Sequence, residues 1–358
     1  PSVLARGNPG RSSGEPCPTV CAPSRLGRDP FGTEDVWRER VQTRRLGHSG
    51  LALSALTLGT LTWGHDTDTF EATRLYDRYR QAGGAALDVP TDASSPVFAG
   101  RVETVRDVLD GAGGPEPTLV MHSMEPRPSA LDVDLTALPC SRRYLLDTLR
   151  AATDTLGRPA DVWLVHGPRY GVRHQEIAWV MQESVRLGLT SYVGLADMDH
   201  WDRATIAAEL RESCSPVVAV AEPLSLLRSA PAGAIASHLA ESGVGLIGFS
   251  PLASGVLTGK YAHTTPPDSR AACPHLAYMV DPYLGEPQAK IVSAAMRVAE
   301  GLGISSAGLA AAWALAQPAV TTVVIGPRTE AQLSDVLKGY DKRLPRELRE
   351  ALTEAALP

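Results

Sequence analysis

The chain has 358 residues, 44% of them hydrophobic, which suits one large α/β domain with a sizeable core. Its net charge of −6 gives no basic surface for nucleic acid or for an anionic membrane, and no apolar run is long enough to span a bilayer. The five cysteines are scattered, so we expect free thiols in a cytoplasmic protein.

The first 40 residues differ in composition from the rest. They are rich in proline, glycine, serine and arginine without an apolar period, so we expect residues 1–40 to be disordered or not part of the native protein. Cys17 and Cys21 have a spacing found in metal sites, but a structural zinc ion needs four ligands and no second pair lies nearby. We therefore predict a single domain over residues 41–358.

Strand-like and helix-like segments alternate from Val41 onward. Short apolar runs predict strands at 56–59, 85–88, 117–122, 161–166, 191–195, 217–220, 244–249 and 321–325. Helical spacing predicts helices at 69–81, 101–109, 141–150, 176–187, 204–211, 232–242, 289–302 and 306–316, and from residue 330. Continuous apolar strands are typical of a sheet that is covered on both faces. The order predicts an α/β fold, a (β/α)8 TIM barrel. The alternative is an open doubly wound sheet, which the absence of G-x-G-x-x-G after the first strand disfavours.

Polar and aromatic residues follow the predicted strands, where a barrel carries its active site. The catalytic candidates are Asp88, His122, His166 and Asp197. The candidates for the substrate pocket are Trp63, Trp201, Glu222 and Phe249. Imidazoles and carboxylates that share one cleft can exchange protons near neutral pH, although a single histidine in a strand is also common in a core. The same groups suit a divalent metal, but no H-x-H pair lies on one strand and we predict no metal.

Five segments in this order resemble the aldo-keto reductase family, over residues from Val41 to about Gly339. They are Arg45–Gly50, Leu58–Gly64, Asp161–His166, Gly248–Tyr261 and Val323–Gln332. The resemblance implies a β-hairpin before the barrel and reduction of carbonyls with NADPH. It also matches Asp88 and His166 to the catalytic aspartate and histidine of the family.

Two residue types that the family uses for catalysis are missing from the expected places. The first lysine is Lys260, and no tyrosine lies between Tyr79 and Tyr144. By position, Ala93 stands where the family has its tyrosine acid, and His122 where it has its lysine. Loss of a general acid typically slows a reaction by about 10²–10⁴-fold.

The cofactor residues implied by the resemblance are only partly kept. Phe249 matches the ring-stacking aromatic. The phosphate and adenosine end would be held by Ser250, Leu252, Gly255, Gly326, Arg328 and Gln332. However, Ala196, Asp197 and Ala221 stand where the family binds the nicotinamide carboxamide with serine, asparagine and glutamine. NADP is thus a possible cofactor that we expect to be held loosely, and no other cofactor is predicted.

These departures favour an enzyme that has lost hydride transfer. We expect acid–base chemistry on a small natural-product intermediate: loss of water, a double-bond shift or ring closure. One alternative is an NADPH-dependent reductase with His122 as proton donor; another is a non-catalytic binding or regulatory subunit. The segment from Ala262 to Gly285 is predicted to fold over the mouth of the barrel, where Cys273 has no visible base to make it a nucleophile. The partner is a small-molecule substrate, and the sequence leaves the oligomeric state open.

Overall fold

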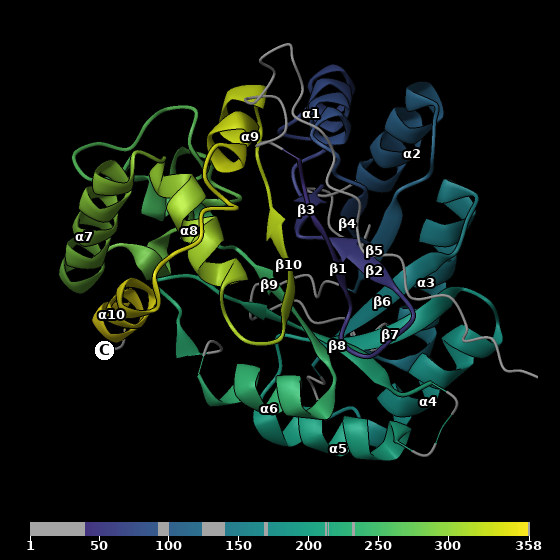
Figure 1. The fold of residues 1–358 in the computed structure, drawn as a ribbon. Coiled ribbons are helices and arrows are strands. Elements are labelled where there is room, and N and C mark those ends of the chain that lie inside the picture. Colours follow the sequence, from purple (N-terminus) through teal and green to yellow (C-terminus); the bar gives the residue numbers. More distant parts are fainter. Residues whose placement is uncertain are drawn as a thin grey trace, which may run out of the picture. The chain divides into compact units, whose positions relative to one another are not determined.

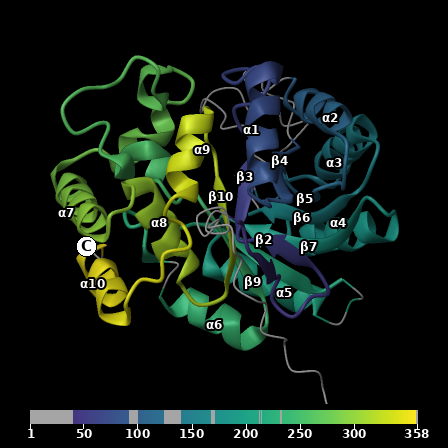
Figure 2. The same ribbon diagram turned by 45° about the horizontal axis from the view of Figure 1, so that its top comes forward.

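A closed barrel of eight parallel strands forms the centre of the domain. The computed structural model describes residues 40–91, 100–123, 140–167, 171–211, 213, 215–230 and 233–356, so the prediction made for residues 1–40 lies almost wholly outside them. The strand order is β10-β3-β4-β5-β6-β7-β8-β9, and helices surround the ring (Figures 1 and 2). The predicted (β/α)8 fold is confirmed.

The barrel strands lie close to the predicted ranges. They are β3 (Leu56–Gly59), β4 (Ala86–Pro90), β5 (Thr118–His122), β6 (Ala160–His166), β7 (Thr190–Ala196), β8 (Val217–Pro223), β9 (Gly245–Phe249) and β10 (Val320–Ile325). The α-helices are α1 (Thr69–Gln81), α2 (Arg101–Ala112), α3 (Arg142–Leu156), α4 (His174–Arg186), α5 (His200–Leu210), α6 (Ala234–Ser242), α7 (Glu286–Leu302), α8 (Ser306–Leu315), α9 (Glu330–Leu337) and α10 (Arg346–Ala356). Between β9 and α7 lie the 3-10 helices η3 (Ala253–Thr258), η4 (Arg270–Ala272), η5 (Ala277–Met279) and η6 (Asp281–Tyr283).

An antiparallel hairpin precedes the barrel, as the family resemblance implied. Its strands β1 (Thr43–Arg45) and β2 (Ala52–Ser54) pair Thr43 with Ser54 and Arg45 with Ala52. Leu46 and Leu53 of this hairpin are fully buried and pack with side chains inside the barrel, among them Ala86 and Val162. The hairpin therefore contributes apolar side chains to the barrel interior.

Side chains along each barrel strand alternate between the interior and the surrounding helices. Ala86 and Val120 belong to the interior cluster, whereas Leu87 and Leu119 belong to the cluster beneath the helices. The same alternation carries Asp88, two residues after Ala86, and His122, two residues after Val120, to the interior side at the ends of β4 and β5. The position of a residue in its strand thus decides whether it reaches the barrel mouth.

Local signals in the sequence fix where several helices begin. The Asp68 carboxylate accepts a hydrogen bond of 2.9 Å from the backbone N–H of Glu71 at the start of α1, and the Ser141 hydroxyl caps α3 in the same way. Among the described residues, no single helix has the length and apolar character needed to cross a membrane; α7 and α8 reach that standard only as a pair, bent by 96°.

The buried hydroxyl of Tyr79 ties α1 to two strands, and its removal tests that link. It donates to the Leu56 carbonyl at 2.6 Å and accepts from the Ala86 N–H at 3.2 Å, and burial raises the pKa of Tyr79 to about 12. Tyr79→Phe leaves both backbone groups buried without this partner, so we expect the free energy of unfolding to fall by about 1–3 kcal/mol. Urea unfolding measures the change, with Tyr283→Phe at a half-buried position as control. An equal, small loss in both variants would contradict the assignment.

Candidate functional site

A cavity of about 360 Å³ opens at the carboxyl ends of the strands. Every barrel strand, or the loop that follows it, contributes to its wall. Its inner part is lined by residues of the strands, among them Asp88, His122 and His166 beside apolar side chains. Its outer part, on the segments that follow β9 and β10, is lined by Lys260, Arg270 and Arg328. One continuous space thus joins an acid–base cluster to a basic end.

Three ionisable side chains from adjacent strands meet at the inner end. Nε2 of His122 lies 3.2 Å from Oδ2 of Asp88, and both side chains are largely buried. The rings of His122 and His166 are 5.6 Å apart, centroid to centroid, and tilted by 38°. An ionised carboxylate only accepts hydrogen bonds, so Nε2 of His122 carries the proton in this contact and Nδ1 is left to exchange a proton.

The other strand residues on the wall are apolar. Ala196 and Ala221 line the cavity together with Leu164, Ile247 and Phe249. Methyl groups neither donate nor accept hydrogen bonds, so the two alanines cannot hold a polar amide group there through their side chains. This stretch suits a hydrophobic part of a ligand.

Cationic groups gather at the outer end. Arg270 donates to the Gly326 carbonyl at 3.1 Å, and Arg328 donates to the Asp268 carbonyl. The backbone N–H of Arg328 donates to Oε1 of Gln332 at 2.9 Å. Burial lowers the pKa of Arg270, and the charge of Arg328 lowers it further. Two guanidinium groups and Lys260 on one wall are chemistry typical of a phosphate site.

The loop beside this basic end has an unusual backbone. Ser250, Ala253 and Ser254 have φ angles of 54°, 46° and 57°, and Gly255 follows at 92°. Residues other than glycine seldom adopt positive φ, and such strain tends to cluster at functional sites. The strained turn makes the Ser250–Gly255 segment a candidate for ligand binding.

Comparison with known proteins agrees with the barrel and its loops. The model of the Aldo/keto reductase family matches residues 138–356. The chain belongs to this family.

Curated relatives resemble nearly the whole of it. It is 28% identical over 313 residues to a protein named probable voltage-gated potassium channel subunit beta from Arabidopsis thaliana, covering 84% of this chain and 92% of the relative. It is 28% identical over 319 residues to the uncharacterized oxidoreductase YrpG of Bacillus subtilis, covering 86% and 94%. It is 26% identical over 306 residues to the L-glyceraldehyde 3-phosphate reductase of Escherichia coli, covering 83% and 86%.

The cavity brings most of the predicted site residues together. Those on its wall are Asp88, His122, His166, Phe249, Ser250, Leu252, Gly255, Gly326, Arg328 and Gln332. Their roles in catalysis or cofactor binding stay predictions. Ala93, matched to the family's tyrosine, lies outside the described residues.

The other four predicted residues lie away from the described cavity wall. Trp63 is 1% exposed and packs in the core beneath the helices. Trp201 is 75% exposed in the first turn of α5. Asp197 follows β7 and pairs with Arg228 at 3.6 Å.

Glu222 points away from the cavity because of its place in β8. Ala219 and Ala221 face the barrel interior, so Glu222 faces the helices, where it pairs with Arg203 of α5. We predicted that the side chains at every strand end point into the cavity. Successive residues of a strand face opposite sides, so counting positions along β8 separates Glu222 from the site.

Two cationic residues of the wall were not predicted as site residues. They are Lys260, near the end of the segment Gly248–Tyr261, and Arg270, the first residue of η4. A signal for Lys260 existed in the sequence, because it lies in Gly248–Tyr261, one of the segments that resemble the family.

The carboxyl of Glu222 gives a prediction about pH. Burial raises its pKa from the ordinary 4.5 to about 7, although the ion pair with Arg203 opposes the shift. The folded chain therefore binds this proton more tightly than the unfolded chain, so the contribution to stability is largest below pH 4.5 and is lost as the pH rises toward 7. We expect Glu222→Gln to flatten the fall in unfolding free energy over this range.

Urea unfolding at several pH values measures the effect. Glu241→Gln, at an exposed position of α6, is the control and keeps the wild-type dependence. If Glu222→Gln follows the wild-type curve as well, the shift assigned to Glu222 is wrong.

Proposed function

We propose that this family member is an enzyme that has lost hydride transfer and performs acid–base chemistry on a small molecule. The observation that carries the proposal is the hydrogen bond between His122 and Asp88 inside the cavity. By resemblance, His122 stands where the family has its lysine. The reactions that fit are loss of water, a double-bond shift or ring closure.

His122 would transfer the proton through Nδ1. Asp88 holds Nε2–H and fixes the orientation of the ring, so neutral His122 is a base and protonated His122 an acid at the same atom. His166, whose ring is 5.6 Å from that of His122, provides a second imidazole within reach of one small substrate. The apolar wall behind them excludes water from the reacting group.

The two ends of the cavity fit a nicotinamide dinucleotide unequally. Lys260, Arg270 and Arg328 suit the phosphates, and bound NADP would supply hydride chemistry at its nicotinamide end. The alanines at positions 196 and 221 give that end no side-chain hydrogen bond. The residues present therefore suit the phosphates of the dinucleotide but offer no side-chain hydrogen bond to its nicotinamide from positions 196 and 221, and this supports a non-redox reaction.

A second candidate is an atypical NADPH-dependent carbonyl reductase. The basic outer end of the cavity and the stacking position of Phe249 favour it. Two of the relatives are named as an oxidoreductase and as a reductase. In this reading His122 donates the proton as the alcohol forms.

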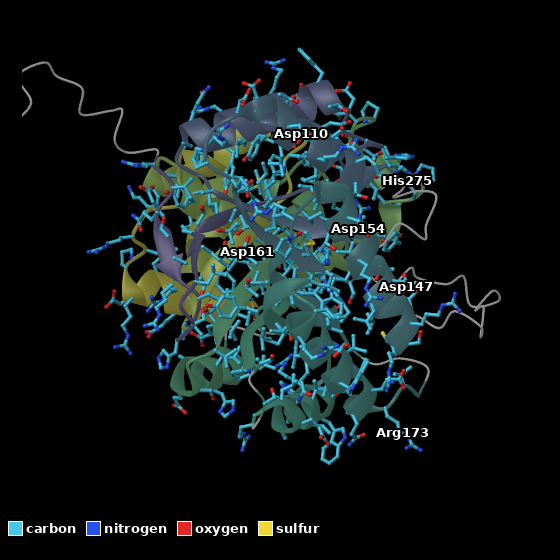
Figure 3. All side chains as sticks on the ribbon, turned by 90° about the vertical axis from the view of Figure 1, so that its right-hand side faces the viewer. Asp110, Asp147, Asp154, Asp161, Arg173 and His275 are labelled. Atoms are coloured by element: carbon cyan, nitrogen blue, oxygen red, sulfur yellow. The ribbon has the colours of Figure 1, made fainter. Side chains whose placement is uncertain are left out.

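A regulatory-subunit role rests on the names of the potassium-channel relatives. The exposed acidic residues Asp110 of α2 and Asp147 and Asp154 of α3 lie on the outer helices (Figure 3). A partner that docked over α2 and α3 would have to complement these charges.

The test of acid–base chemistry needs no natural substrate. We expect the full chain in deuterated water, without nicotinamide, to exchange protons beside the carbonyl of small ketones or to dehydrate β-hydroxy ketones. Mass spectrometry detects both. His122→Gln removes the proton-transfer group, so the rate should fall by about 10²–10⁴-fold.

A matched histidine serves as control. His174 makes the same kind of contact with Asp202, at 2.6 Å, away from the cavity, so His174→Gln should keep the rate. Turnover that strictly requires NADPH, with deuterium passing from labelled NADPH to product, would overturn the first proposal and establish the second.

A further inference from the structure

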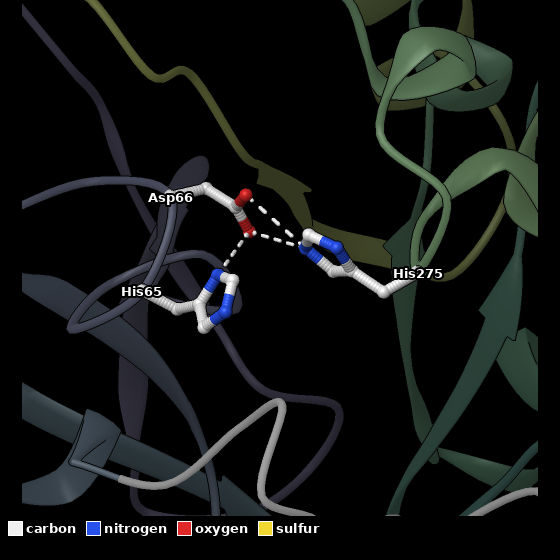
Figure 4. A group of neighbouring side chains, drawn as sticks. All are labelled: His65, Asp66 and His275. Carbon is white, nitrogen blue, oxygen red and sulfur yellow. Dashed lines mark hydrogen bonds and ion pairs between the residues drawn. The ribbon is translucent and has the colours of Figure 1, made fainter.

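Two histidines and an aspartate meet at the rim of the barrel, outside the cavity wall. His65 and Asp66 follow β3, and His275 lies between η4 and η5, so Asp66 and His275 are 209 positions apart in the sequence. Both imidazoles are directed at the carboxylate of Asp66 (Figure 4). Sequence order gave no hint of the meeting, because it depends on how the segment after β9 folds back.

The distances within this cluster suit a metal ion. Nε2 of His275 lies 3.0 and 3.1 Å from the two oxygens of Asp66, and Nδ1 of His65 lies 3.4 Å from Oδ2. Zinc bonds to nitrogen and oxygen of about 2.0–2.2 Å in a tetrahedron place ligand atoms about 3.3–3.5 Å apart. One ligand atom from each residue lies within 4.8 Å of the others, so small side-chain rotations bring all three onto one ion.

We propose that His65, Asp66 and His275 form a binding site for a divalent transition metal, Zn²⁺ above all, which fastens the segment after β9 to the loop after β3. Two imidazoles and one carboxylate are a ligand set for zinc and its neighbours, whereas Ca²⁺ and Mg²⁺ prefer oxygen ligands alone. A water molecule completes the tetrahedron. The proposal departs from the sequence prediction of no metal, which concerned the strand ends.

The arrangement of the two rings agrees with this role. They meet edge to face, with centroids 4.7 Å apart and planes at 69°, so neither ring stacks flat on the other beside Asp66. A metal ion would bind the imidazoles in their neutral form and the carboxylate in its ionised form.

The position of the cluster gives the ion a structural task. The loop after β3 that carries His65 and Asp66 also contributes Leu61 to the cavity wall, and the segment that carries His275 also contributes Met279. The charge of Asp66 also raises the pKa of Arg270, against the larger effects of burial and Arg328. A metal at this point would join the loop after β3 to the segment after β9, both of which contribute to the cavity wall.

Binding of Zn²⁺ and Co²⁺ to the full chain tests the site. Calorimetry should give one tight equivalent of Zn²⁺ that raises the unfolding temperature, and Co²⁺ should show the visible spectrum of a tetrahedral nitrogen–oxygen site. His275→Gln and His65→Gln should each lower the affinity by more than about tenfold, since even losing a residue behind a ligand typically costs that much. His263→Gln, exposed in the same segment, is the control and should bind as wild type.

Two outcomes would overturn the proposal. One is Zn²⁺ binding that survives in both histidine variants. The other is a thiolate-to-cobalt absorption band, which would assign the ion to cysteines such as Cys17 and Cys21. His65 is partly exposed, so His65→Gln keeps the test valid if His275→Gln folds poorly. A far-ultraviolet circular dichroism spectrum equal to that of the wild type, recorded in EDTA, confirms the fold of each variant.

Discussion

The hydrogen bond between Nε2 of His122 and the carboxylate of Asp88 is the contact on which the proposed chemistry depends. It exists because β4 and β5 are parallel neighbours and each carries an inward-facing polar residue at or near its carboxyl end, Asp88 two residues before the end of β4 and His122 at the end of β5. Within a buried cleft such a pair is stronger than in water and fixes one nitrogen of the ring. The other nitrogen, the apolar wall and the basic outer end then define what a ligand can meet.

Much of the fold could be predicted from the sequence because its signals are local. The first strand of the barrel, β3, and the first helix, α1, have the bounds that their apolar spacing predicts, and Asp68 caps the helix at its start. Helix α10 was missed although the sequence marks it: Leu348, Leu352 and Ala356 recur at helical spacing after Pro345, and Leu352 and Ala356 are buried. Helix α5 begins four residues before its predicted start, at the cap supplied by Asp199.

The site was harder to predict where it depends on direction or on folding at long range. The place of Asp88, His122 and His166 on the cavity wall could be predicted because all three lie at or near the carboxyl ends of strands, on the interior side. Glu222 failed because one step along β8 turns a side chain to the opposite face. The contact between Asp66 and His275 could not be predicted from the sequence. It depends on the path of the segment after β9, which no helical or strand periodicity determines.

The central claim is that the inner end of the cleft no longer holds a nicotinamide ring. Calorimetry comparing NADP⁺ with 2′-phospho-ADP-ribose, which lacks the nicotinamide, tests it without a substrate. Hydrogen bonds to the carboxamide are worth about 1 kcal/mol each, so two or three of them make NADP⁺ bind more than about tenfold more tightly. The account predicts equal dissociation constants for the two ligands in this protein. Tenfold or tighter binding of NADP⁺ would contradict it.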